Sequence, residues 1–194
     1  MSETVIGAQL YTLRDFLKTP EDIAQTMKKV AKIGYRAVQL SGLGKIDPKE
    51  LRKIADGEGL EIAATHIGFN EMRDETQRVI DEHNTLGCKH SAIGGMPGEY
   101  RNAEGYLRFA REATAVAQKL NAGGLTFSYH NHSFELQKFG DRTGLQILIE
   151  DSGSEVLFEI DTYWIQHGGG DSTQWIDKVK KRIVLLHLKD MAVL

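Results

Sequence analysis

The feature that most constrains the fold of this chain is a repeat of short β-type runs, separated by segments with helical character. The runs begin 25 to 35 residues apart and occupy residues 6–10, 37–40, 62–65, 91–93, 126–129, 156–160 and 184–188. Strands that alternate with helices at such a regular spacing are typical of parallel βα units. Seven such strands without long irregular connections favour a (β/α)8 barrel over an open doubly wound sheet.

The segments between the runs carry signals for the start and the end of helices. Thr19 and Asp47 each stand before a proline and acidic residues, the usual order at a helix N-terminus. Gly34, Gly59 and Gly87 follow helical segments, and glycine readily adopts the left-handed conformation in which many helices end. We therefore expect helices to connect the strands.

The length of the chain is too short for a complete barrel. Eight βα units need roughly 250 residues, whereas this chain has 194 and ends six residues after the seventh run. We therefore predict a single α/β domain over residues 1–194, a (β/α)8 TIM barrel that is truncated after the seventh strand and lacks the C-terminal βα unit. Such a barrel leaves two sheet edges exposed.

The composition is that of an ordinary soluble protein and excludes several classes. Apolar residues make up 41% and charged residues 26% of the chain. The sequence contains no run of about 18 apolar residues, the length needed to span a membrane. A net charge of −3 offers no basic surface for nucleic acid. The single cysteine excludes an internal disulfide, and the N-terminus lacks the pattern of a signal peptide. We therefore predict a cytoplasmic protein without a membrane or nucleic-acid partner.

Acidic and imidazole side chains collect where the later strands end, which is where barrel active sites lie. Glu135, Asp161 and His187 follow one another at intervals of 26 residues, as expected for consecutive βα units. Burying such groups is costly unless a cation binds them. This arrangement predicts one divalent metal ion, with Mn²⁺, Mg²⁺ or Co²⁺ best suited to carboxylate-rich ligands and Zn²⁺ as an alternative.

Three segments, YHNHSFE, FEIDTYWIQHGG and LLHLKDM, resemble the xylose-isomerase-like barrel superfamily, specifically its sugar phosphate isomerase/epimerase branch (AP endonuclease family 2). Epimerases of this superfamily hold one divalent metal with Glu, Asp, His and a second Glu from strands five to eight. By this resemblance, Glu135, Asp161 and His187 match the first three ligands. The fourth would come from the eighth strand.

The resemblance implies a metal-dependent isomerase or epimerase that removes a proton next to a carbonyl group and forms an enediolate. Glu135 would then be one acid–base residue as well as a metal ligand. His66, His132, Trp164 and Lys189 would bind the substrate, a small-molecule sugar or sugar phosphate. A homo-oligomer is left open, and the 194-residue chain itself is expected to have weak or no activity.

The sequence leaves three other functions open. An inosose-dehydratase-like lyase could use the same metal and carboxylates to remove water from a polyol ketone. An endonuclease IV-like AP endonuclease is less favoured, because that family has a zinc-binding histidine where this chain has Trp164. The chain could also be an inactive metal- or sugar-binding fragment. Glu159, on the same face as Asp161, is interpreted as a structural or supporting acid.

Overall fold

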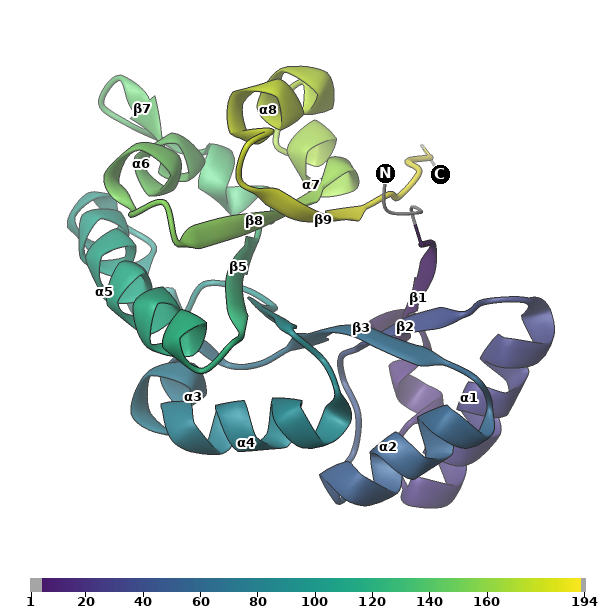
Figure 1. Cartoon of the computed structure of the whole chain (residues 1–194). Coiled ribbons are helices and arrows are strands. Elements are labelled where there is room, and N and C mark those ends of the chain that lie inside the picture. Colours follow the sequence, from purple (N-terminus) through teal and green to yellow (C-terminus); the bar gives the residue numbers. More distant parts are fainter. Residues whose placement is uncertain (1–4, 193–194) are drawn as a thin grey trace.

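The computed structural model describes residues 5–192 and contains a seven-stranded parallel sheet, curved as part of a barrel (Figure 1). The strands follow chain order: β1 (Gly7–Gln9), β2 (Ala37–Leu40), β3 (Glu61–His66), β4 (His90–Ile93), β5 (Thr126–His130), β8 (Val156–Asp161) and β9 (Ile183–His187). Each predicted strand boundary is met within one residue. The predicted α/β fold class, a truncated TIM barrel, is therefore confirmed.

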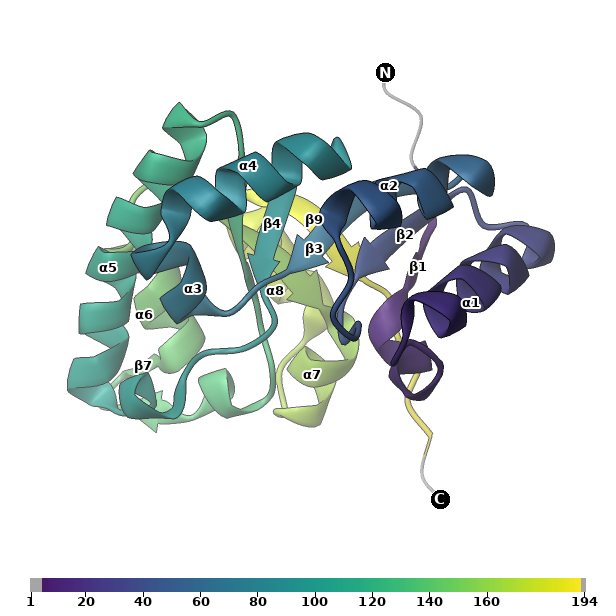
Figure 2. The same cartoon turned by 90° about the horizontal axis from the view of Figure 1, so that it is seen from below.

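Helices surround the outside of this sheet (Figure 1). The α-helices are α1 (Pro20–Ile33), α2 (Pro48–Gly57), α3 (Phe69–Asp74), α4 (Thr76–Leu86), α5 (Ala103–Ala122), α6 (Gly144–Asp151), α7 (Thr162–His167) and α8 (Ser172–Val179). Three 3-10 helices follow strands or loops: η1 (Leu10–Phe16), η2 (Gly98–Tyr100) and η3 (Phe134–Leu136). In Figure 2 the strands run from the side marked N to the side marked C, so their carboxyl ends share one side of the molecule.

The residues that were predicted to begin and end helices do so in the structure. The Thr19 side chain accepts a hydrogen bond from the Asp22 amide, and the Asp22 carboxylate accepts one from the Thr19 amide. This pair of bonds caps α1. The Asp47 side chain likewise caps α2. Gly34 and Gly87 end their helices with φ of 116° and 64°, conformations that cost little only for glycine.

The apolar core lies between the sheet and the helices, in two clusters. One contains the aromatic rings of Phe69, Phe109 and Phe127, and the other includes Ile23 and Met27 of α1. Each of these five side chains is at most 2% exposed, and burial of a large apolar side chain contributes about 1.5–3 kcal/mol. This packing fixes the strands, and hence the side chains at their carboxyl ends.

The connection between β5 and β8 contains a small addition that the sequence patterns did not predict. After η3, strands β6 (Lys138–Phe139) and β7 (Arg142–Thr143) pair as an antiparallel hairpin. Gly140 provides the turn with φ of 66°. This hairpin and η3 determine where Glu135 lies.

The sheet does not close between β1 and β9 within residues 5–192, because its strand order ends at these two strands. A cavity of about 820 Å³ lies along them. Ile6 and Leu188 beside this opening are 78% and 79% exposed. The two exposed edges predicted for an incomplete barrel are therefore present. None of the helices in these residues is sufficiently long and apolar to cross a membrane.

Candidate metal centre and active site

The carboxyl ends of β5, β8 and β9 bring together His130, Asp161 and His187. His130 Nε2 lies 3.1 Å from Asp161 Oδ2, and His187 Nδ1 lies 3.4 Å from the same oxygen. One potential ligand atom from each residue lies within 4.8 Å of the others. Sheet pairing accounts for this geometry, because β5, β8 and β9 are neighbours and Asp161 pairs directly with His187.

A second group shares His187 and lies beside the first. Glu159, fully buried on β8, has Oε2 at 2.6 Å from His66 Nε2 and Oε1 at 3.1 Å from His187 Nε2. Gln39 Nε2 donates a hydrogen bond of 2.7 Å to Glu159 Oε1. The ring of His187 therefore lies between two buried carboxylates, one on each edge. The alternation along β8 correctly put Glu159 and Asp161 on one face.

The charges in this cluster balance one another. Burial alone would raise the pKa of Asp161, but hydrogen bonds from His130, His187 and Lys189 hold it well below the ordinary value. Bonds from His187 and His66 similarly outweigh burial and lower the pKa of Glu159. Burial would lower the pKa of His187, yet its bonds to Asp161 and Glu159 raise it to about 9. At neutral pH two carboxylates thus face two cations, His187 and Lys189.

Glu135 is not part of either group. It lies in η3, where the Tyr129 hydroxyl donates to its Oε1 at 2.7 Å and the His132 amide donates to its Oε2 at 2.9 Å. Its carboxylate closes the turn after β5. The structure therefore brings Asp161 and His187 together as expected, but His130 takes the β5 position that was expected for Glu135. Burial raises the pKa of Glu135 to about 7.

All four predicted substrate-binding residues lie around the first group. The ring of His132 lies 4.8 Å from that of His130 and 5.2 Å from that of Trp164. Lys189 Nζ is 2.6 Å from Asp161 Oδ2 and 5.2 Å from the centre of the Trp164 ring. The ring of His66 lies 5.2 Å from that of His130 and 5.7 Å from that of His187, and its two nitrogens contact Glu159 and Ser41.

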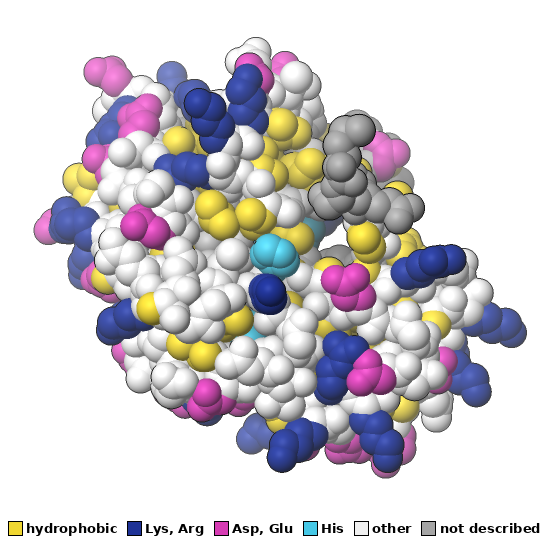
Figure 3. Space-filling model, viewed as in Figure 1, with side chains coloured by type: hydrophobic (Ala, Val, Ile, Leu, Met, Phe, Trp, Pro, Cys, Tyr) yellow, Lys and Arg dark blue, Asp and Glu magenta, His cyan; other side chains and the backbone are white. Residues whose placement is uncertain are grey.

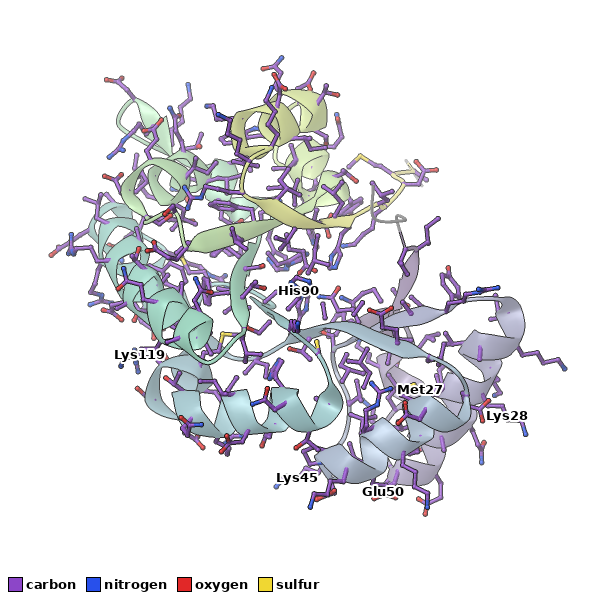
Figure 4. All side chains as sticks on the ribbon, in the orientation of Figure 1. Met27, Lys28, Lys45, Glu50, His90 and Lys119 are labelled. Atoms are coloured by element: carbon purple, nitrogen blue, oxygen red, sulfur yellow. The ribbon has the colours of Figure 1, made fainter. Side chains whose placement is uncertain are left out.

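The donor set fits a divalent metal ion. One carboxylate and two imidazoles suit Mn²⁺, Co²⁺ or Zn²⁺. In the structure the positive charges of His187 and Lys189 compensate the carboxylates of Asp161 and Glu159, which a doubly charged cation would also do. His90 lies away from this centre, because it begins β4 at the amino end of the sheet (Figure 4). Its Nδ1 lies 2.9 Å from Thr126 Oγ1.

Figure 3 shows how charged side chains are distributed on one face of the molecule. Acidic and basic side chains are interspersed there rather than gathered by sign. Binding to a nucleic-acid backbone rests on a concentration of lysine and arginine. The distribution agrees with the net charge of −3.

Comparison with known proteins identifies relatives along almost the whole chain. A family model described as "Xylose isomerase-like TIM barrel" matches residues 27–193. The inosose dehydratase of Geobacillus kaustophilus (strain HTA426) is 24% identical over 195 residues, which cover 86% of this chain and 61% of that protein. The chain thus spans less than two thirds of the length of this curated relative.

Solved structures share the same fold. A sugar phosphate isomerase/epimerase from Parabacteroides distasonis ATCC 8503 has a TM-score of 0.82 at 23% identity, covering 98% of this chain and 77% of that chain. An L-ribulose 3-epimerase has a TM-score of 0.72 at 16% identity, covering 95% of this chain and 69% of that chain. At these identities the likeness establishes the fold.

Proposed function

Because the chain belongs to the xylose isomerase-like TIM barrel family, we propose that residues 1–194 are one domain of a divalent-metal-dependent isomerase or epimerase. Its substrate is a sugar or a sugar phosphate. The observation that carries this proposal is the buried, charge-balanced group of His130, Asp161 and His187 at the carboxyl ends of neighbouring strands. The similarity to the Parabacteroides sugar phosphate isomerase/epimerase and to the L-ribulose 3-epimerase supports this class of reaction.

His130, Asp161 and His187 are the residues that would hold the metal. A divalent cation there would polarise the carbonyl oxygen of the substrate and favour loss of the neighbouring proton. Two imidazoles in the donor set favour Mn²⁺, Co²⁺ or Zn²⁺ over Mg²⁺, which prefers oxygen ligands. To bind the cation, His187 must lose its proton and Lys189 must leave Asp161.

The residues around the metal group have distinct proposed roles. Lys189, once released from Asp161, binds a hydroxyl or phosphate oxygen of the substrate. Trp164 and His132 form one wall, and burial lowers the pKa of His132 to about 4, so its ring is neutral and can hydrogen-bond a sugar hydroxyl. His66 lies beside the metal group and contacts the Glu159 carboxylate through its Nε2.

Glu135 stays the predicted acid–base residue. Its pKa of about 7, raised by burial, supports this role because proton transfer is most effective when the pKa lies near the working pH. Its two oxygens accept bonds from Tyr129 and the His132 amide, so contact with a substrate requires these bonds to open.

The test measures exchange of the substrate proton on the carbon next to the carbonyl group. The protein, loaded with Mn²⁺, is incubated in D₂O with a panel of ketoses and ketose phosphates, and NMR follows deuterium incorporation next to the carbonyl. We expect weak but measurable exchange that stops with EDTA and with Asp161→Asn or His187→Ala. His90→Ala, at the other end of the sheet, is the matched control and should keep the exchange. Exchange that survives EDTA, or none with any sugar, would contradict the proposal.

A second candidate is dehydration of a polyol ketone. The observation that favours it is the similarity to inosose dehydratase across 86% of this chain. The same proton next to the carbonyl is removed, but a hydroxyl group then leaves as water. Ultraviolet absorbance of the resulting conjugated ketone would distinguish this reaction from epimerisation in the same incubation.

A further inference from the structure

The site contains a second buried carboxylate to which the proposed reaction gives no task. Glu159 is 0% exposed and lies two residues before Asp161 on β8, hence on the same face. Its Oε1 accepts a bond of 2.7 Å from Gln39 Nε2 and lies 3.1 Å from His187 Nε2. Its Oε2 lies 2.6 Å from His66 Nε2. Three side chains from three other strands thus converge on one carboxylate.

These contacts restrict the ring of His187. Its Nε2 is also 2.7 Å from Gln39 Oε1, so this edge of the ring is held by β2 and β8 together. The two nitrogens of an imidazole lie on different edges, and a bond to one decides what the other faces. With Nε2 held by Glu159 and Gln39, Nδ1 faces Asp161 Oδ2 at 3.4 Å.

We propose that Glu159 is a positioning residue, which holds the Nδ1 edge of His187 toward Asp161 and His130 so that these three residues can bind one metal ion. The inference rests on the proposed metal centre, but not on the identity of the sugar. Hydrogen bonds from ring nitrogens to carboxylates commonly orient metal-binding histidines, and their loss weakens metal binding roughly tenfold to a hundredfold.

Glu159 could instead hold a second metal ion with His66 and His187, since their ligand atoms also lie within 4.8 Å of one another. The partners of the two carboxylates argue against this. Gln39, which donates to Glu159, is only 8% exposed and has little room to move away, whereas Lys189, which pairs with Asp161, has a side chain that is 39% exposed and can leave. His66 is itself braced by Ser41 at 3.2 Å. A satisfied network of this kind is suited to holding rings in place, and it predicts one metal ion per chain.

The first test is zinc titration of the purified protein by calorimetry. Glu159→Leu should lower zinc affinity roughly tenfold to a hundredfold, whereas Glu159→Gln keeps an acceptor for His187 and should restore most of it. Gln39→Met removes the other partner of His187 Nε2 and should cause a smaller loss, which keeps the test valid if Glu159→Leu does not fold. Phe158→Leu is the matched control: it opens a cavity on the opposite face of β8, so it should lower the melting temperature but not zinc affinity.

The second test determines by NMR which nitrogen of the His187 ring carries the proton. Long-range ¹H–¹⁵N spectra of the zinc-loaded protein should show His187 with its proton on Nε2, and this pattern should be lost in Glu159→Leu. An unchanged pattern and affinity in that variant, or two zinc ions per chain, would overturn the inference and leave the metal-dependent reaction standing. No zinc binding by the unaltered protein would overturn both, while normal zinc binding without proton exchange would overturn the proposed reaction alone.

Discussion

Replacing Glu135 by glutamine should change how stability depends on pH. The Glu135 side chain is fully buried, and burial raises its pKa to about 7 from 4.5. A carboxyl group with a raised pKa holds its proton more tightly in the folded than in the unfolded state. Its contribution to stability is therefore fully present below pH 4.5 and is lost as the pH rises through 7.

The expected magnitude follows from the two pKa values. The interval between 4.5 and about 7 corresponds to about 3 kcal/mol of unfolding free energy, at about 1.4 kcal/mol per pKa unit. Glutamine is neutral at every pH. Its oxygen can accept from the His132 amide and its NH₂ group can donate to the Tyr129 hydroxyl, so both existing contacts keep a partner.

Urea unfolding of the metal-free protein and of Glu135→Gln, between about pH 4 and pH 8, measures this effect. The stability of the unaltered protein relative to the variant should fall by about 3 kcal/mol over this range. Glu104→Gln, at an exposed position on α5, is the control and should show no such trend. If the curves of the unaltered protein and of Glu135→Gln run parallel, the pKa of Glu135 is the same in the folded and the unfolded protein, and the reasoning fails.

Three further predictions concern Lys189, Gly144 and Cys88. Lys189→Met should raise Zn²⁺ affinity severalfold in calorimetry, because the ammonium group at 2.6 Å competes with a cation for Asp161; an unchanged affinity would mean that Lys189 leaves without cost. Gly144→Ala should lower the unfolding free energy by about 1–3 kcal/mol in urea, since a Cβ there would collide with the Tyr106 ring, and full stability would show that this ring can move. Cys88, buried and with its pKa raised by burial to about 11, should resist thiol reagents until the protein unfolds; rapid labelling of the folded protein would contradict this.

Much of the fold could be predicted because it depends on a periodic signal. Strands buried on both faces give apolar runs, and the interval between runs reflects the helix that must return the chain. The β6–β7 hairpin could not be predicted in this way, because two-residue strands are too short to show a pattern. Its pairing depends on the turn at Gly140.

The candidate site was predictable where its residues lie within strands. Asp161 and His187 end β8 and β9, where alternation fixes the direction of a side chain. Glu135 lies five residues beyond β5, and its direction depends on the turn that its own carboxylate closes. His130 did have a signal, because alternation opposite the buried Tyr129 turns it toward the site, and pairing puts it beside Glu159.

The hydrogen bond between Gln39 and His187 joins positions 148 residues apart in the sequence. Neither the first strands nor the last can therefore form the hydrogen bonds around His187 alone, and these bonds can exist only after β2 and β9 have come together. A cation bound by His187 would therefore stabilise the contact between the first and the last strands of the folded chain. Its binding should slow amide hydrogen exchange in β2 and β9 to the same extent, so that metal content reports on the integrity of the entire sheet.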